Sequence, residues 1–252
     1  MTTPGVRVDI DGDLAYVVID RPERANALDA ATACAIAEAV EEVSADARVA
    51  IVTGEGSTFC AGGDLDELEA WAVSSEEDVR EHLYSCFQGM IRAVRASSAI
   101  VIAAINGAAV GAGCDLALAC DLRVATKGAK LGQVWVRLGV IPGTGGAWFT
   151  QALAGPTAAA EMLLTGKLVT AEDAYSLGLV NSVVEPGALL DEARALAARI
   201  LEHPRGGVIA NKRALVAASE PFVESALQHA AQVQPARFTS EEFRHAVRKA
   251  RK

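Results

Sequence analysis

The stretch from Ile100 to Asp121, IVIAAINGAAVGAGCDLALACD, constrains the fold of this chain more than any other segment. It begins with the apolar run Ile100–Ile105, passes through the small residues Ala108–Gly113 and continues as the apolar run Cys114–Ala119. This pattern predicts a buried strand, a tight turn and the start of a helix. Backbone N–H groups at a helix start have no partners within the helix, so such a turn can hold an oxyanion or a phosphate. Asp115 places one carboxylate just inside the predicted helix.

The bulk composition favours a single large α/β domain, or one domain with an appendage. The chain has 252 residues, of which 51% are hydrophobic, enough for a continuous core. No apolar run is long enough to predict a membrane span, and the N-terminal MTTPGVRVDI does not resemble a secretory signal. The net charge of −9 argues against non-specific binding to nucleic acid. The five cysteines are odd in number and lack CxxC spacing, which favours reduced thiols in a cytoplasmic protein.

Strand and helix patterns alternate along the first two thirds of the chain. Alternating apolar residues about Asp11-Gly12-Asp13 predict a β-hairpin over 6–20. Further strands are expected at 49–53, 122–126 and 180–184, and helices at 29–44, after Asp64, and at 74–98, 170–177, 187–202, 206–218, 220–233 and 240–250. This order predicts an α/β core over residues 1–190 and a helical C-terminal subdomain over 191–252.

Several common chemistries lack their motifs. The four histidines are scattered without the spacing of a metal site. A serine hydrolase needs GxSxG, which is absent, and Gly139–Thr144 lacks the lysine of a phosphate-binding P-loop. The turn Gly111-Ala112-Gly113 lacks the third glycine of a dinucleotide fingerprint, because Leu116 occupies that place.

Two turns rich in glycine and alanine remain, and each follows a predicted buried strand. The first is Cys60-Ala61-Gly62-Gly63-Asp64 and the second is Val110-Gly111-Ala112-Gly113-Cys114. If neighbouring parallel strands present both turns, two backbone N–H groups can converge on one carbonyl oxygen and form an oxyanion hole. The alternative is a pair of tight packing turns without a ligand, and the residues alone leave both interpretations open.

Five blocks resemble, in order, the enoyl-CoA hydratase/isomerase (crotonase) superfamily. They are RPERANALD (21–29), FCAGGDL (59–65), AAINGAAVGAGCDLALACD (103–121), LGVIPGTGG (138–146) and LTGKLVTAEDAYSLGLVNSVV (164–184). The resemblance implies a crotonase-like (ClpP/crotonase) α/β spiral of ββα units with a helical C-terminal part. It also implies a homotrimer or dimer of trimers, and an acyl-CoA thioester substrate with no cofactor beyond the coenzyme A that the substrate carries.

Site residues are also implied by this resemblance. The N–H groups of Ala61 and Ala112 would hold the thioester oxygen. The coenzyme A contacts would fall on Arg24 and Ala25 and on the loop Ala61-Gly62-Gly63-Asp64-Leu65. For Arg24 a phosphate contact and a solvated surface charge are both open. Asp64 is better interpreted as a helix N-cap than as a catalytic group. In the C-terminal helix, Ala250 stands where relatives usually carry an aromatic residue.

The sequence departs from the hydratases of this family at both catalytic carboxylates. The two glutamates that serve as general base and general acid fall at Asp115 and Trp135 here. Aspartate is one methylene shorter than glutamate, and an indole N–H cannot act as a base at accessible pH. The usual pair is therefore absent, which favours isomerase-type chemistry with Asp115 as a single proton shuttle and Trp135 as a wall of the acyl site. The alternatives are a non-catalytic acyl-CoA-binding protein and a thioesterase or C–C hydrolase on the same fold.

Overall fold

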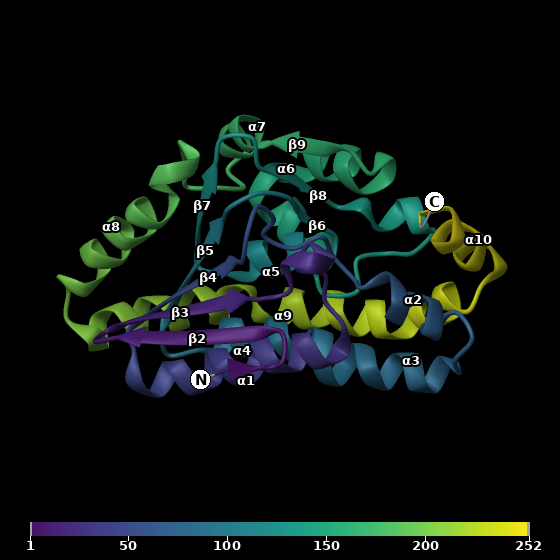
Figure 1. Cartoon of the computed structure of the whole chain (residues 1–252), viewed down its shortest axis with the longest axis horizontal. Helices are drawn as coiled ribbons and strands as arrows, with labels where there is room; N and C mark the ends of the chain where they lie inside the picture. Colours follow the sequence, from purple (N-terminus) through teal and green to yellow (C-terminus); the bar gives the residue numbers. More distant parts are fainter. Residues whose placement is uncertain (1, 251–252) are drawn as a thin grey trace.

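A seven-stranded sheet forms the centre of the protein in the computed structural model, which describes residues 2–250 (Figure 1). Its strands run in the order β1 (Thr2–Thr3), β2 (Val6–Asp11), β3 (Leu14–Ile19), β4 (Val49–Gly54), β5 (Ile100–Ile105), β7 (Leu122–Thr126) and β10 (Ser182–Val184). The β1–β2 and β2–β3 pairs are antiparallel, and the pairs from β3 to β10 are parallel. Every residue of β4 and β5 is buried, which explains why the sequences of both strands are mostly apolar and do not alternate with polar residues.

A second sheet of three strands lies beside the first and carries part of the site. It consists of β6 (Ala109–Val110), β8 (Lys130–Gly132) and β9 (Leu168–Thr170), in the order β6-β8-β9. The β6–β8 pair is parallel and the β8–β9 pair is antiparallel. Because β6 follows β5 after only three residues, the chain passes directly from the large sheet to the small one at the predicted turn.

Helices cover both faces of the large sheet. The longer ones are α1 (Ala30–Asp46), α4 (Gln88–Ala96), α5 (Ala112–Ala119), α6 (Gly146–Thr165), α8 (Leu189–Leu201), α9 (Arg205–Phe238) and α10 (Glu241–Ala250). The shorter ones are η1 (Pro22–Arg24), α2 (Leu65–Trp71), α3 (Glu76–His82), η2 (Leu83–Phe87), η3 (Val134–Leu138), α7 (Ala171–Ser176) and η4 (Pro186–Ala188). The main core lies on the face that carries α1, α4 and α5, and α8 covers the opposite face with a smaller apolar cluster.

The hairpin and two helix starts agree with the sequence patterns. The hairpin β2–β3 turns at Gly12, as predicted. Asp29 caps α1 by accepting a hydrogen bond of 2.7 Å from the N–H of Thr32. The hydroxyl of Thr170 caps α7 by accepting a hydrogen bond from the N–H of Asp173. Helix α5 begins at Ala112, two residues before the expected start. Ala112 and Gly113, the last two residues of the predicted turn, are therefore already helical.

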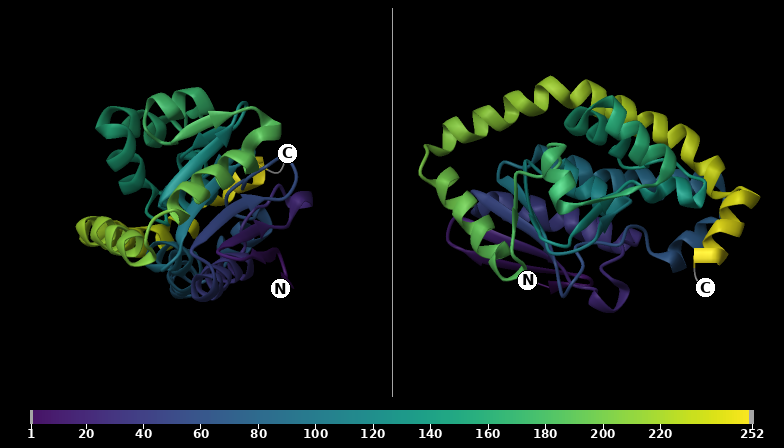
Figure 2. Two further views of the ribbon diagram at one scale, coloured as in Figure 1. Left: turned by 90° about the vertical axis from the view of Figure 1, so that its left-hand side faces the viewer. Right: turned by 90° about the horizontal axis from the view of Figure 1, so that it is seen from above.

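The C-terminal helices correct the predicted pattern at one point. The sequence patterns predict separate helices over 206–218 and 220–233, but α9 is one helix of 34 residues with Pro221 inside it. The proline removes one backbone donor. The helix continues past it because Val223 and Leu227 are buried against the body of the protein. Figure 2 shows α9 running along the outside of the molecule towards α10.

The predicted boundary between core and helical subdomain falls in the first turn of α8. This helix packs on the large sheet through Leu189, Ala193 and Ala197. Within residues 2–250, no helix has the length and apolar character needed to cross a membrane. The same part of the chain contains no cluster of three metal-binding side chains.

Two cysteines contradict the expectation of five reduced thiols. Cys34 of α1 and Cys86 of η2 form a disulfide with their Cα atoms 4.7 Å apart. The sequence could not show this pair, because 52 residues separate its members and their side chains meet only when α1 packs on η2. Cys60, Cys114 and Cys120 are free and buried, and burial raises the pKa of the Cys60 thiol to about 12.

Candidate active site

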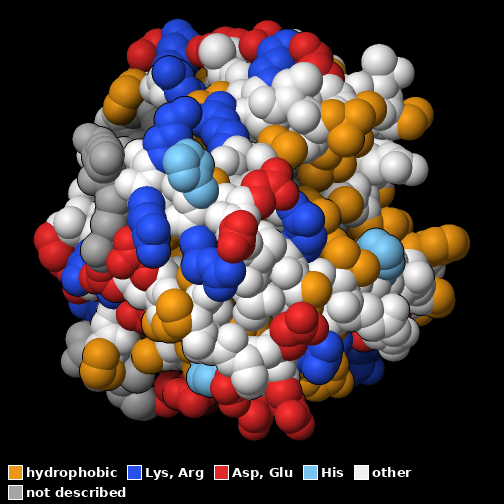
Figure 3. Space-filling view, turned by 90° about the vertical axis from the view of Figure 1, so that its right-hand side faces the viewer, with side chains coloured by type: hydrophobic (Ala, Val, Ile, Leu, Met, Phe, Trp, Pro, Cys, Tyr) orange, Lys and Arg blue, Asp and Glu red, His pale blue; other side chains and the backbone are white. Residues whose placement is uncertain are grey.

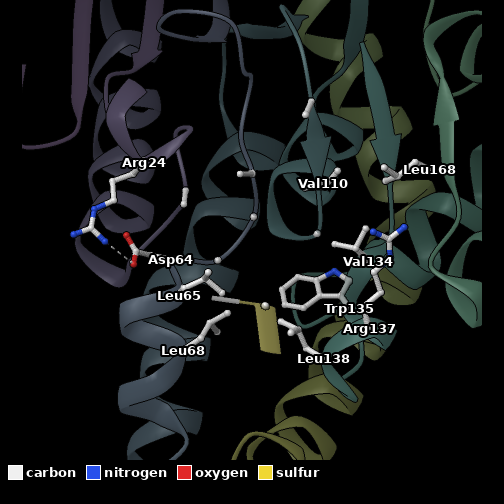
Figure 4. A pocket seen from close by; sticks show the side chains of 17 residues that line it. Arg24, Asp64, Leu65, Leu68, Val110, Val134, Trp135, Arg137, Leu138 and Leu168 are labelled. Carbon is white, nitrogen blue, oxygen red and sulfur yellow. Dashed lines mark hydrogen bonds and ion pairs between the residues drawn. The ribbon is translucent and has the colours of Figure 1, made fainter. Parts of the chain in front are cut away.

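A cavity of about 570 Å³ lies between the first glycine-rich turn, the small sheet and the last helix (Figure 4). Its wall is mostly apolar, and charged side chains stand at Arg24, Asp64 and Arg137. The lining residues are Arg24, Ala27, Ala61, Gly62, Gly63, Asp64, Leu65, Leu68, Ala108, Val110, Gly111, Val134, Trp135, Arg137, Leu138, Leu168 and Ala250. A mostly apolar cavity with a few polar groups is typical of a small-molecule site.

The two glycine-rich turns lie against each other at one wall of the cavity. The N–H of Cys60 donates to the carbonyl of Ala108 at 2.9 Å, and the N–H of Val110 donates to the carbonyl of Cys60 at 3.1 Å. A Cβ on Gly113 would lie 2.5 Å from the Cys60 oxygen, so only glycine allows this approach. A Cβ on Gly62 would lie 3.8 Å from the backbone nitrogen of Ala112. The fold therefore brings together the two segments that the sequence presented as separate turns.

The two predicted donor groups differ in their present partners. The N–H of Ala112, at the start of α5, has no acceptor within residues 2–250. The N–H of Ala61 donates to the carbonyl of Ala25 at 3.0 Å. Ala112 itself is fully buried and lies behind the lining of the cavity. One backbone donor is therefore free, and the other is shared with the loop that follows β3.

The loop that follows β3 is held in an unusual backbone conformation. Ala25 and Asn26 both have positive φ, at 51° and 56°. The Asn26 side chain stabilises this turn, because it donates to the carbonyls of Glu55 and Thr58 and accepts from the N–H of Arg21. The conformation of this turn directs the carbonyl of Ala25 towards the N–H of Ala61, which donates a hydrogen bond to it. The loop thereby positions Arg24 at the edge of the cavity.

Asp64 has the structural role that the sequence favoured. Its carboxylate accepts a hydrogen bond of 2.9 Å from the N–H of Asp66 and caps α2. It also forms ion pairs with Arg21 at 3.0 Å and with Arg24 at 3.4 Å. Arg24 is about half exposed and also pairs with Asp66. The Arg24 guanidinium can therefore turn to an external anion without leaving a buried charge unpaired.

Asp115 lies in the first turn of α5 and is completely buried. Its Oδ1 accepts a hydrogen bond of 2.8 Å from Nε2 of Gln133, and its Oδ2 accepts one of 2.5 Å from Oγ1 of Thr144. The backbone N–H groups of Thr144, in the loop before α6, and of Gly146, its first residue, also favour the charged carboxylate. The carboxylate is not part of the cavity lining. It is completely buried and therefore lies behind the wall of the cavity.

Burial raises the pKa of Asp115 from 3.8 to about 6, because the charged form loses its hydration. The hydrogen bonds from Thr144, from Gln133 and from the two backbone N–H groups oppose this effect by stabilising the carboxylate. A pKa near 6 suits a group that takes up and releases a proton near neutral pH.

Trp135 forms a flat wall of the cavity and is 7% exposed. It lies on η3, and Figure 4 shows its ring across the cavity from Leu65 and Leu68. Its Nε1 is buried and has no hydrogen-bond partner within the described residues. Trp135 therefore supplies an aromatic face to the cavity and has a buried donor without a partner in the described part of the chain.

Most of the predicted site residues line the cavity, and three lie behind it. The lining includes Arg24, Ala61, Gly62, Gly63, Asp64, Leu65 and Trp135, whereas Ala25, Ala112 and Asp115 are outside it. Sequence reasoning missed Gln133 and Thr144, which hold Asp115, and Arg137. Gln133 and Thr144 could have been noticed as isolated polar residues in the apolar segment 128–146.

Comparison with known proteins identifies the family. The family model described as "Enoyl-CoA hydratase/isomerase" matches residues 9–251. The crotonyl-CoA hydratase of Syntrophomonas wolfei is 36% identical over 217 residues, which cover 85% of this chain and 82% of that protein. The (E)-benzylidenesuccinyl-CoA hydratase of Thauera aromatica is 38% identical over 224 residues, which cover 84% and 82% of the two chains.

Solved structures agree with the sequence comparison. An enoyl-CoA hydratase from Bacillus halodurans matches with a TM-score of 0.90 at 26% identity, over 97% of this chain and 99% of that one. An enoyl-CoA hydratase/isomerase from Mycobacterium paratuberculosis matches with a TM-score of 0.90 at 30% identity, over 97% and 98% of the two chains. The expected crotonase fold is thus confirmed. Together with the site described above, these matches show that the chain is an acyl-CoA enzyme of the enoyl-CoA hydratase/isomerase family.

Proposed function

We propose that this enzyme binds an acyl-CoA thioester with its carbonyl at the paired turns, stabilises the thioester enolate there and moves a proton with Asp115. The observation that supports the proposal is the contact between the turns, in which the free N–H of Ala112 lies close to Gly62 of the first turn. Backbone donors aimed at a developing oxyanion contribute several kcal/mol to catalysis in enzymes of many folds.

We favour isomerisation of a double bond over hydration by two carboxylates. Among the described lining residues Asp64 is the single carboxylate, and it is occupied as a helix cap and ion-pair partner. Asp115 is then the remaining group with a pKa suited to proton transfer. One carboxyl suffices to remove a proton from C2 and return it to C4 on the same face of the substrate. The two relatives named above are hydratases, so water addition must be assayed beside isomerisation.

The mouth of the cavity suits the anionic end of coenzyme A. Arg24 stands at its edge, and Ala250 of α10 completes the lining. Figure 3 shows basic side chains gathered on the side of the molecule where α10 lies, although the net charge is −9. Arg244, Arg248 and Lys249 of α10 belong to this side. We assign the phosphates to this edge and the acyl group to the wall formed by Trp135 and its apolar neighbours.

The position of Asp115 favours a second candidate. Both of its oxygens are occupied and it lies behind the wall, so a reaction that uses only the oxyanion donors would not need it. Hydrolysis of the thioester, or of a C–C bond next to it, is such a reaction. It would release free coenzyme A or a shortened acyl group, in contrast to isomerisation and hydration.

The variant Asp115→Asn separates these candidates. Ultraviolet absorbance of the conjugated 2-enoyl thioester rises when a 3-enoyl-CoA is isomerised and falls when a 2-enoyl-CoA is hydrated, so one assay measures both. We expect Asp115→Asn to lose isomerisation by about 100-fold or more, with little change in the Kd for a saturated acyl-CoA. Full activity in this variant would remove Asp115 from the mechanism. Tight binding by the wild type with neither isomerisation nor hydration would overturn the first candidate, and thiol release would support the second.

We also propose that the enzyme assembles as a homotrimer or a dimer of trimers and acts in the cytoplasm. Large apolar side chains on the outer helices support assembly, because Leu164 of α6 and Leu215 and Phe222 of α9 are 76%, 74% and 60% exposed. Light scattering after size exclusion should give the mass of three or six chains. A stable monomer at micromolar concentration would contradict this assignment.

A further inference from the structure

Arg137 differs from the other cation of the cavity lining in its partners. The described lining holds three charged side chains, those of Arg24, Asp64 and Arg137. Arg24 forms ion pairs with Asp64 and with Asp66. Within residues 2–250 no carboxylate forms an ion pair with Arg137, whose guanidinium bonds to a backbone carbonyl instead. The positive charge of Arg137 is therefore available to an anion in the cavity.

The Arg137 side chain is anchored at the end of α6. Its Nη2 donates a hydrogen bond of 2.6 Å to the carbonyl of Gly166, the C-cap residue of α6. A Cβ on Gly166 would lie 3.1 Å from Cγ and from Nε of Arg137, so the glycine leaves room for the side chain to lie across it. The Gly166 carbonyl occupies only part of the donor capacity of a guanidinium. Because the anchored side chain has little freedom left to lose, a ligand can bind the remaining donors at a low entropic cost.

Arg137 lies on the side of the cavity that the proposed function gives to the acyl group. Figure 4 shows it beside Val134 and Leu168, across the cavity from Arg24. The coenzyme A phosphates are assigned to the edge at Arg24, so the second cation stands near the other end of the bound molecule. Its neighbours in the lining, Val134, Leu138 and Leu168, are apolar. One cation among apolar side chains suits an acyl group that is apolar along its chain and carries one anionic group.

We propose that the substrate is a coenzyme A monothioester of a dicarboxylic acid, and that Arg137 determines this specificity by binding the free carboxylate of the acyl group. The assignment rests on the proposed function, because it requires an acyl-CoA with its acyl group at the wall that carries Arg137. The planar guanidinium matches the two oxygens of a carboxylate and stays charged at any accessible pH. A phosphate of coenzyme A offers similar oxygens, so the experiment includes coenzyme A without an acyl group.

The test compares charged and neutral acyl groups of equal length. The probes are succinyl-CoA, glutaryl-CoA and adipyl-CoA, each beside the thioester in which the free carboxyl is a primary amide. Calorimetry gives their Kd values for the wild type, for Arg137→Met and for Arg137→Lys, which keeps the charge without the planar guanidinium. Arg199→Met is the matched control, because Arg199 is an exposed arginine of α8, on the opposite face of the large sheet. Thermal unfolding of each variant measures any effect on stability.

We expect the wild type to bind one of the three acids about tenfold more tightly than its amide. Arg137→Met should remove this preference without changing the Kd for the amide or for coenzyme A alone. Arg137→Lys should keep part of the preference, and Arg199→Met should keep all of it.

Three results would overturn the assignment and leave the proposed function intact. The first is a wild type that binds each acid no more tightly than its amide. The second is an equal loss of affinity for the acids, the amides and coenzyme A in Arg137→Met, which would place a coenzyme A phosphate at Arg137. The third is a lower unfolding midpoint in Arg137→Met with the preference unchanged, which would limit Arg137 to its contact with α6. Failure of the wild type to bind any acyl-CoA would overturn the proposed function itself.

Discussion

Thr144 donates a hydrogen bond of 2.5 Å from its hydroxyl to Oδ2 of Asp115, and this bond joins the loop before α6 to the first turn of α5. Thr144 is fully buried, so no water competes for the contact. Because the hydroxyl stabilises the charged carboxylate, it lowers the pKa that burial raises. The strength of Asp115 as a base is therefore set partly by a residue 29 positions away.

The pH dependence of catalysis should change when the hydrogen bond from Thr144 to Asp115 is removed. If Asp115 acts as a base, kcat/KM for isomerisation should rise with an apparent pKa near 6. Thr144→Val removes the hydroxyl donor and should move that apparent pKa upward, with reduced activity at neutral pH. Thr170→Val is a suitable control, because Thr170 caps α7 at a distance from Asp115. A profile with the same apparent pKa in Thr144→Val would show that another group is being titrated.

Stability should also depend on pH through Asp115. Its pKa is raised from 3.8 to about 6, so between these values the folded state binds more protons than the unfolded state. The contribution of Asp115 to the free energy of unfolding is therefore largest below the unfolded pKa and is lost as pH rises through 6. The difference between wild type and Asp115→Asn should fall by about 2 kcal/mol from pH 4 to pH 7. Urea unfolding across this range measures it, and a difference independent of pH would contradict the raised pKa.

Trp135→Ala should change the preference for the acyl group. Removing the indole enlarges the cavity on the side of Val134 and Leu138, so longer or branched acyl groups gain space. We expect kcat/KM for long chains to rise about tenfold relative to short chains. Leu168→Ala, at another part of the lining, provides the comparison for a general loss of packing. If the ratio of kcat/KM values for long and short enoyl-CoA chains stays unchanged, Trp135 does not form a wall of the acyl site.

Arg24→Met tests the assignment of the coenzyme A phosphates. An exposed ion pair contributes up to about 1 kcal/mol, so the affinity for coenzyme A should fall about fivefold, and less at high salt. Arg137→Met is the matched control, because Arg137 also lines the cavity but its guanidinium bonds to the Gly166 carbonyl. Calorimetry with coenzyme A and with 3′-dephospho-coenzyme A identifies the phosphate involved. Equal losses in the two variants would indicate a general effect of positive charge.

The disulfide between Cys34 and Cys86 should appear in the oxidised protein and vanish under reductant. Alkylation followed by mass spectrometry should show the three buried cysteines as thiols and the other two as a pair. Closing a 52-residue loop stabilises the folded state by about 4 kcal/mol in the chain-entropy description. We expect Cys34→Ser to lower the unfolding midpoint without reductant and to match the wild type with it. Five alkylated cysteines in the untreated protein would contradict the pair.

Local signals in the sequence predicted much of the fold. The hairpin at Gly12 and the caps at Asp29 and Thr170 depend on neighbouring residues, and the structure confirms them. The continuation of α9 through Pro221 depends on packing against distant helices, which no local pattern records.

The site was predictable in its backbone and not in its side-chain network. Small residues marked both turns, because close approach of two chain segments demands them. The partners of Asp115 are 18 and 29 residues away, and only the folded chain brings them to it. The hydrogen bond from the N–H of Ala61 to the carbonyl of Ala25 could not be predicted either, because it depends on the positive φ angles of the loop after β3.

The backbone contacts between the Cys60 and Val110 segments have a consequence for how this enzyme can be altered. A donor that belongs to the main chain survives the replacement of its own side chain, so point substitutions leave the Ala112 donor in place as long as the turns can close. Leu65, Leu68, Leu138 and Leu168 can be varied around that fixed element. Libraries restricted to these four positions should therefore yield folded proteins that differ in the acyl groups they accept, which makes the cavity a practical starting point for directed evolution.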